Sequence, residues 1–351
     1  MGDTLRVGLV GIGNISRQYL DTLPRLPGVS LVAAADLDPA RTVPDVRMMR
    51  PAELYAADDV DLVLNLTIPR AHAAVALSAI AAGKHVYSEK PLALSTEEGR
   101  EVLAAASSAG VRVGCAPDTV LGTGTQTARR CLDDGAIGTP VAATAFMVTP
   151  GHERWHPDPE FYYRPGGGPL FDMGPYYLTA LVTLLGPVRR VTGLASTPRA
   201  SRVIGSGPRA GTEFPVDVRT HVAGVLEHEN GAVTTLMMSF DVWAANLPHI
   251  EVYGTNGALS VPDPNGFAGE VKLYEPGREW RTVPVSAGHR NAGRGTGVAD
   301  LATALRTNTE HRANGTLAYH VLDTMESLLQ AAEQAQTQTV TSTSPRPTPV
   351  P

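Results

Sequence analysis

The chain has 351 residues, which is long enough for two domains with separate cores, and its formal net charge is −6. No basic run interleaved with aromatic residues occurs, which argues against nucleic acid as a partner. The two cysteines, Cys115 and Cys131, fit neither a disulfide framework nor a metal motif, and they are typical of a reducing compartment. No apolar stretch is long enough to span a bilayer, and no signal peptide precedes the first strand. We therefore expect a soluble, cytoplasmic protein.

The N-terminal stretch carries a dinucleotide-binding pattern. Residues 5–10 read as a buried strand, and a helical pattern begins at Ser16. Between them stands a G-x-G-x-x-S run, in which two glycines allow a tight turn and close approach of a pyrophosphate to backbone N–H groups. The candidate cofactor-binding residues of this turn are Gly11, Gly13, Asn14 and Ile15.

A second strand, residues 30–35, ends in Asp36. An acidic side chain at this place can accept both ribose hydroxyls of NAD and would repel the 2′-phosphate of NADP. Arg41 is near enough in the sequence to weaken that preference, so NADP stays possible. The alternative is that Asp36 only caps a local turn.

Two further strands are expected at residues 61–66 and 85–88. The first leads into a helix over 71–82 and the second into a Glu-Lys-Pro turn, whose Lys90 is one of only three lysines in the chain. Ligands of an open parallel sheet lie beyond the carboxyl ends of its strands, so both connections belong with the glycine turn and Asp36. The cofactor-binding candidates added here are Thr67, Ile68, Pro69, His72, Glu89 and Lys90.

The Lys90–Pro91 bond is a candidate for the cis form. A lysine in such a turn supplies a small ammonium group whose pKa can be tuned, which a guanidinium cannot. The alternative is an ordinary lysine of an exposed loop.

The remaining pattern divides the chain. A helix over 95–110 and a strand over 112–116 complete a first domain at residues 1–118, and residues 119–336 read as a helix, a series of mostly antiparallel strands and two closing helices. Residues 337–351 are rich in Ser, Thr and Pro and predict a disordered tail. The fold class is therefore α/β, with a Rossmann dinucleotide-binding domain followed by an α+β domain that has a large open sheet.

A glycine triplet at 166–168 precedes a helical run to residue 185. If that helix includes Asp172, then Asp172 and Tyr176 lie at i and i+4, so a carboxylate and a phenol point the same way beside a permissive loop. The alternative is that Asp172 caps the helix while Tyr176 packs in the core.

The loop before the triplet, residues 151–163, contains candidate sugar contacts. Trp155 could stack on the apolar face of a sugar, with His152 and Tyr163 beside it. A packed corner or a subunit contact is the alternative. His152 and His156 have the i, i+4 spacing of a metal pair, but no third ligand accompanies them, and we expect no metal site.

These motifs together resemble those of the Gfo/Idh/MocA oxidoreductases, in their order and spacing, up to about residue 335. The resemblance rests on the glycine fingerprint, Glu89-Lys90-Pro91, the glycine triplet with Asp172 and Tyr176, and Val252-Tyr253-Gly254-Thr255-Asn256-Gly257. It implies NAD(P)-dependent redox chemistry on sugars, cyclitols or related polyols. It also implies a homodimer or homotetramer formed through the C-terminal sheet.

Most members of the family have His where this chain has Tyr176, although the glucose–fructose oxidoreductase and dihydrodiol dehydrogenase branches resemble it in having Tyr. The predicted catalytic residues are Lys90, Asp172 and Tyr176, and the predicted substrate contacts are Lys90, Asp118, His152, Trp155, Tyr163, Asp172 and Tyr176. In the expected mechanism an ammonium at Lys90 beside Tyr176 favours the phenolate, so that the phenol can take the alcohol proton at neutral pH. Two other functions fit the same residues less well: an NAD-dependent glycosidase acting by transient oxidation, and a sugar or dinucleotide sensor without turnover.

Overall fold

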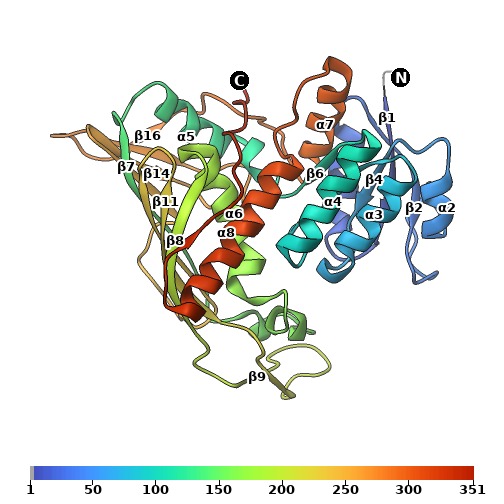
Figure 1. Cartoon of the computed structure of the whole chain (residues 1–351), viewed down its shortest axis with the longest axis horizontal. Coiled ribbons are helices and arrows are strands. Elements are labelled where there is room, and N and C mark those ends of the chain that lie inside the picture. The colour runs from blue at the N-terminus through green and yellow to red at the C-terminus, as the bar shows by residue number, and fades with distance from the viewer. Residues whose placement is uncertain (1–3) are drawn as a thin grey trace. The chain divides into compact units, whose positions relative to one another are not determined.

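The computed structural model describes residues 4–351, which form two compact units (Figure 1). Unit 1 takes the chain up to Gly122 together with His289–Leu322 and Val350. Unit 2 takes Thr123–Gly288 with Asp323–Pro349 and Pro351. The boundary near Gly122 lies close to the predicted one at residue 118, but the return of residues 289–322 to the first unit was not predicted.

Unit 1 is a parallel sheet with helices on both faces. Its strand order is β3-β2-β1-β4-β5-β6, and every neighbouring pair is parallel. The strands are β1 (Leu5–Val10), β2 (Val29–Ala35), β3 (Arg47–Met49), β4 (Leu62–Asn65), β5 (His85–Ser88) and β6 (Val113–Cys115). The helices are α1 (Ser16–Thr22), α2 (Pro51–Ala56), α3 (His72–Ala81), α4 (Thr96–Ala109) and α7 (Thr296–Thr307), with 3-10 turns η1 (Leu23–Arg25), η2 (Pro69–Ala71) and η3 (Thr119–Leu121).

Two apolar clusters, one on each face, hold this sheet between its helices. One joins Leu9 and Leu62 to Val298 and Leu301 of α7, and the other joins Val63 and Val86 to residues of α2, α3 and α4. Strands that are buried on both faces have continuous apolar sequences, which is why the sequence predicts strands at β1 and β4. Because α7 buries its apolar stripe here, the segment that contains it belongs to unit 1 and not to the predicted domain 119–336.

Unit 2 is built on a nine-stranded sheet of order β16-β15-β14-β13-β7-β12-β11-β8-β17, in which only the β7–β12 pair is parallel. The strands of unit 2, including the separate pair β9–β10, are β7 (Pro140–Val148), β8 (Val188–Ser196), β9 (Ser201–Val203), β10 (Glu213–Pro215), β11 (His221–His228), β12 (Val233–Ser239), β13 (Ile250–Gly254), β14 (Gly257–Val261), β15 (Val271–Tyr274), β16 (Arg281–Val283) and β17 (Gln338–Thr339). The helices are α5 (Thr123–Asp133), α6 (Gly168–Leu185) and the later part of α8 (Gly315–Gln334), with 3-10 turns η4 (His152–Arg154) and η5 (Glu160–Tyr163).

Helices α5, α6 and α8 lie on one face of this sheet, and Figure 1 shows no helix over the other face in the described part of the chain. The side chains of that other face include an apolar row in cross-strand register: the exposed Leu194 beside the partly buried Ala223, then Met237 and Phe146, which are also partly buried. Leu194 is 72% exposed. A tight turn at residues 229–231 joins the antiparallel strands β11 and β12.

The tail, predicted to be disordered, has defined contacts. Thr339 in β17 pairs with Arg190 of β8, and the Val340 N–H donates to the Arg189 carbonyl (3.0 Å). Ser344 is 1% exposed, and Arg346 forms an ion pair with Asp133 at 2.9 Å. A segment poor in apolar residues is thus held by the open edge of β8 and by polar side chains, which composition alone does not reveal.

Candidate functional site

The turn after β1 is shaped for close approach of a ligand. Gly11 has φ +97°, and a Cβ there would lie 2.8 Å from backbone atoms of Leu66 and Thr67, so only glycine fits. At Gly13 a Cβ would meet no atom within 4 Å, so the space above its backbone is open. Asn14 beside it is exposed and Ile15 partly buried. A glycine turn that is packed below and open above is what a pyrophosphate requires.

Asp36 is held in place at the end of β2. One carboxylate oxygen accepts the Ile12 N–H at 2.6 Å and the other accepts the Asp38 N–H at 2.9 Å. The guanidinium of Arg41 lies 3.8 Å from the first oxygen and is half-exposed. The carboxylate is therefore oriented by the same turn that would hold the pyrophosphate, and the residues present fit the NAD that this fingerprint implies.

The loop after β4 is tied together by polar contacts. The side-chain carbonyl of Asn65 accepts from the Thr67 hydroxyl at 2.6 Å, while its amide donates to the His72 carbonyl. The ring of His72 is fully buried, with Nδ1 at 2.7 Å from the Pro91 carbonyl and Nε2 at 3.0 Å from the Thr67 carbonyl. Burial lowers the pKa of His72. The predicted cofactor contact at His72 is therefore replaced by an interior role, joining the Thr67 loop to the Glu-Lys-Pro turn.

The Glu-Lys-Pro turn lies at the end of β5. The Lys90–Pro91 bond is cis, as predicted. Glu89 is buried, where one carboxylate oxygen accepts from the Tyr19 hydroxyl (2.7 Å) and the other from the Lys90 N–H (3.0 Å). Glu89 thus shapes the turn from the inside, whereas Lys90 is partly exposed.

The sheet order places these turns along one edge. Gly11, Asp36, Thr67 and Lys90 follow β1, β2, β4 and β5, which are adjacent in the order β2-β1-β4-β5. The exposed Ile68 and the partly buried Pro69 follow Thr67 on the same side of the sheet. This part of the predicted arrangement is confirmed, because the carboxyl ends of parallel strands meet at one edge.

Asp118 does not lie where a substrate contact was predicted. Its side chain has 0% exposure, and one oxygen accepts the N–H groups of Gly295 (2.8 Å) and Gly297 (2.9 Å). Burial raises the pKa of Asp118 to about 6, against the lowering effect of Arg294. Asp118 therefore anchors the start of α7 from inside unit 1.

In unit 2 the helix α6 contains Asp172 and Tyr176 one turn apart, as predicted. Asp172 is the only charged residue of this helix, most of whose residues are buried. Gly174 faces Met325 of α8, since a Cβ there would lie 3.0 Å from its sulfur, whereas Asp172 points to the first residue of η4. A lone carboxylate on an apolar helix needs a polar partner or a function.

The partner is His152. Its Nε2 lies 3.0 Å from Asp172 Oδ2, and both side chains are mostly covered. The imidazole ring packs against Tyr162 and Phe240, with ring centroids 4.6 and 4.5 Å away. The sequence predicted His152 as a substrate contact and did not predict its pairing with Asp172, because the two residues are joined by a loop whose path the sequence does not define.

The other predicted residues of unit 2 differ in exposure. Trp155 is 59% exposed and is thus accessible to a ligand. Tyr163 has 0% exposure, and its hydroxyl donates to Glu153, so the predicted substrate contact there is wrong: it is an interior residue. Tyr176 is 5% exposed and Tyr177 is 1% exposed, with the Tyr177 hydroxyl 3.0 Å from His249 Nδ1. Burial alone does not separate a proton carrier from a core residue, and the role of Tyr176 stays a prediction.

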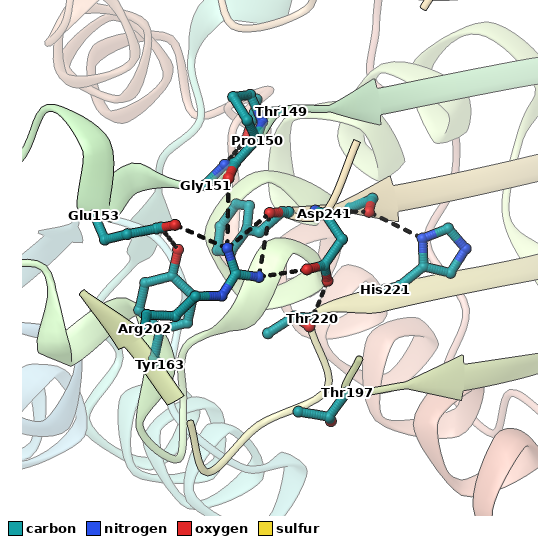
Figure 2. A network of polar contacts seen from close by, with 12 residues as sticks. Thr149, Pro150, Gly151, Glu153, Tyr163, Thr197, Arg202, Thr220, His221 and Asp241 are labelled. Carbon is teal, nitrogen blue, oxygen red and sulfur yellow. Dashed lines mark hydrogen bonds and ion pairs between the residues drawn. The ribbon is translucent and has the colours of Figure 1, made fainter. Parts of the chain in front are cut away.

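A buried polar network contacts the loop of residues 151–163 (Figure 2). The guanidinium of Arg202, in β9, stands between Glu153 at 2.8 Å and Asp241 at 2.5 Å. Two carboxylates face one guanidinium, and each carboxylate also accepts a hydrogen bond from a neutral hydroxyl group: Tyr163 donates to Glu153 and Thr220 donates to Asp241. Removing one partner of such a buried pair costs about 3–5 kcal/mol. Sequence analysis did not find this network, because its members come from five separate segments.

Within residues 4–351, no group of three or more His, Cys, Asp or Glu side chains could hold a metal ion. A helix long and apolar enough to cross a membrane is also lacking among them.

Two family models match this chain, one in each unit. Residues 5–116 match the model of an oxidoreductase family with an NAD-binding Rossmann fold, and residues 125–260 match the GFO/IDH/MocA C-terminal domain. The 1,5-anhydro-D-fructose reductase of Ensifer adhaerens is 29% identical over 273 residues, which are 72% of this chain and 74% of that protein. Inositol 2-dehydrogenase 3 of Saccharopolyspora erythraea is 34% identical over 155 residues, covering 40% of this chain and 44% of that protein.

Among solved structures, levoglucosan dehydrogenase in complex with NADH and L-sorbose is similar, with a TM-score of 0.82. It is 19% identical, and the alignment covers 97% of this chain and all of the other. An NAD-binding oxidoreductase from Klebsiella pneumoniae has a TM-score of 0.83 at 23% identity, with coverage of 97% and 100%. At such identities the likeness concerns the fold.

Proposed function

Because the chain belongs to the Gfo/Idh/MocA family of NAD-binding oxidoreductases, we propose that it transfers a hydride between a secondary alcohol of a sugar, cyclitol or related polyol and NAD. The observation that carries this proposal is the pairing of the Gly11–Gly13 turn with Asp36, whose carboxylate is held by the Ile12 N–H. Relatives whose names specify anhydrofructose, inositol and xylose support the substrate class. NADP stays a second cofactor candidate because of Arg41.

Bound NAD would supply the hydride acceptor at its nicotinamide ring. We propose that Tyr176, as phenolate, takes the proton of the substrate hydroxyl while the carbon becomes a carbonyl. An unperturbed phenol with a pKa near 10 is a poor base at neutral pH, and an ammonium such as that of Lys90 would favour the phenolate. Asp172 would accept a hydrogen bond from a substrate hydroxyl, and the exposed indole of Trp155 would cover an apolar sugar face. The meeting of Lys90 with Tyr176 stays a prediction.

We test this with a panel of aldoses, inositols and anhydro sugars, each supplied with NAD or NADP and read at the nicotinamide absorbance. Tyr176→Phe should lower kcat by about two or more orders of magnitude, because the ring stays but its proton-exchanging oxygen is lost. Tyr177→Phe is the matched control, one position further along α6, and should keep turnover. If the parent binds NAD but oxidises no member of the panel, the proposed function is wrong. If Tyr176→Phe keeps turnover, another residue carries the proton.

We also propose that the chain forms a homodimer or homotetramer through the open face of the unit 2 sheet. The apolar row of Leu194, Ala223, Met237 and Phe146 supports this, because Leu194 is exposed, the other three are only partly buried, and contiguous apolar surface marks contact sites. Leu194→Lys should shift the molar mass measured by light scattering towards the monomer. An unchanged mass would exclude this row from the interface.

We also propose that the protein is cytoplasmic. Both cysteines, Cys115 and Cys131, are free and buried, which is consistent with a cytoplasmic enzyme.

A further inference from the structure

We propose that His152 and Arg202 are positioning residues for Asp172: a chain of polar contacts runs from the end of β12 through Arg202, Glu153 and Tyr163 to the backbone N–H of His152, whose imidazole holds the Asp172 carboxylate. The role of Asp172 in turnover rests on the proposed function. The coupling between Arg202 and His152 rests on the contacts within unit 2.

The first link is Arg202, which is 3% exposed. Besides its two ion pairs, its Nη1 and Nη2 both donate to the Phe240 carbonyl at 3.3 Å. Its Nη1 also lies 3.4 Å from the Pro150 carbonyl, at the start of the loop that carries His152 (Figure 2). The planar fork of a guanidinium can satisfy these acceptors together, which an ammonium cannot. Arg202 therefore fixes the β9–β10 hairpin, the end of β12 and the loop after β7 to one another.

The second link runs through Glu153 to Tyr163. One Glu153 oxygen accepts from Arg202 and the other from the Tyr163 hydroxyl, and that hydroxyl in turn accepts the His152 N–H at 3.2 Å. The guanidinium carbon of Arg202 lies 5.3 Å from the centre of the Tyr163 ring. The backbone of His152 is thus bound to a phenol that Arg202 and Glu153 hold from two sides.

The third link is the imidazole itself. A carboxylate oxygen can only accept, so Nε2 of His152 must carry the proton it shares with Asp172 Oδ2. The Nδ1 atom is buried and has no hydrogen-bond partner among the described residues. Walls formed by Tyr162 and Phe240 leave the ring little freedom to turn. One oxygen of Asp172 is therefore oriented by a ring whose own position depends on Arg202.

The test uses two variants and one matched control in the full chain. Tyr163→Phe removes only the hydroxyl that joins Glu153 to His152, and Arg202→Met removes the centre of the network. The control is Arg209→Met, in the connection between β9 and β10. Arg209 also pairs with two carboxylates, those of Asp158 and Glu160 in the loop of residues 151–163, but its side chain is 46% exposed. Surface pairs of this kind contribute little.

The first readout is independent of turnover. Long-range ¹H–¹⁵N spectra report the tautomer of each of the ten histidines, and the His152 signal is the one lost in His152→Ala. We expect the parent to show an Nε2–H imidazole at His152. In Tyr163→Phe and Arg202→Met the pattern should move towards a mixture of tautomers, while Arg209→Met should leave it unchanged. An unchanged His152 signal in both folded network variants would overturn the proposal. If Arg202→Met fails to fold, Tyr163→Phe decides, since it keeps every ion pair.

The second readout is kinetic. Arg202→Met should lower kcat by about tenfold or more, because small misplacements of a substrate-holding group have effects of this size. The affinity for NADH, which binds to unit 1, should stay the same. The distinguishing experiment is the double variant: if Arg202 acts through His152, adding Arg202→Met to His152→Ala should lower kcat no further. Additive losses would show that Arg202 acts independently of His152. If the parent shows no turnover with any polyol while the His152 signal responds as expected, the proposed reaction fails and the positioning chain stands.

Discussion

Asp118 gives the most direct test of whether a predicted substrate contact is in fact an internal anchor. Its carboxylate is fully buried and accepts the N–H groups of Gly295 and Gly297 at the start of α7. The perturbation is Asp118→Asn, which keeps the shape and a carbonyl acceptor for both glycines but removes the charge. The amide nitrogen would take the place of Oδ1, which has no hydrogen-bond partner among the described residues. A pH-independent cost of about 1–3 kcal/mol for that unsatisfied donor is expected.

The pH dependence follows from the pKa. Burial raises the pKa of Asp118 from 3.8 to about 6, so the folded chain holds this proton more tightly than the unfolded chain. The resulting stabilisation is fully present below pH 3.8 and is lost as the pH rises through about 6. The whole loss amounts to roughly 3 kcal/mol, of which about 1.4 kcal/mol falls between about pH 5 and pH 7.5. Carboxylates with lowered pKa values, such as Asp61, act in the opposite direction, so only the difference between parent and variant isolates Asp118.

The assay is urea unfolding of parent and Asp118→Asn across this pH range, with KM for the polyol measured at neutral pH. The difference in unfolding free energy should move in favour of the Asn variant by about 1–2 kcal/mol as the pH rises from 5 to 7.5. The KM of the folded variant should stay near that of the parent. If the difference in unfolding free energy between parent and variant does not change with pH, burial does not raise the pKa of Asp118. A large rise in KM with unchanged stability would restore Asp118 as a substrate contact.

Two further predictions concern unit 1. NAD should bind at least several-fold more tightly than NADP, because the carboxylate beside the glycine turn would repel a 2′-phosphate, and Asp36→Ser should reduce this ratio of affinities. If fluorescence titration shows equal affinities of the parent for NAD and NADP, Asp36 is not part of the cofactor site. Lys90→Ala should leave NAD affinity near normal and lower kcat by orders of magnitude. Lys90→Arg should not restore kcat, because the guanidinium is broader than an ammonium and its pKa cannot be tuned. Full activity of the Arg variant would show that a positive charge alone is needed.

The sequence was most informative where chemistry and chain order coincide. A parallel sheet sends every strand end to one edge, so the turns at Gly11, Asp36, Thr67 and Lys90 could be assigned to one edge without knowing how the helices pack. Local signals at helix ends were equally direct: the Ser95 hydroxyl accepts the Glu98 N–H, and Gly110 ends the same helix with φ +67°.

What could not be predicted depends on segments that return from far along the chain. Asp118 was predicted as a substrate contact alongside the family resemblance, whereas its carboxylate is bound by the backbone of residues 295–297, which return from far along the chain. The tail looked disordered because its composition lacks apolar residues, yet the edge of β8 gives its backbone partners. Burial at both places is decided by contacts that no local pattern records.

The same reasoning explains why the predicted substrate residues of unit 2 were harder to place from the sequence than the predicted cofactor residues of unit 1. In unit 1 each ligand-facing residue follows its own strand, so its place is set by the sheet. In unit 2 the side chain that meets Asp172 comes from a loop with no regular structure beyond two short 3-10 turns, and the conformation of that loop is imposed by the buried charge of Arg202. A loop fixed by one interior ion-pair network can change the residues it presents without disturbing the sheet behind it. The difference between the two units therefore predicts that substitutions altering polyol choice will concentrate in residues 151–163 and their supports, while those altering cofactor choice will stay at the ends of β1 and β2.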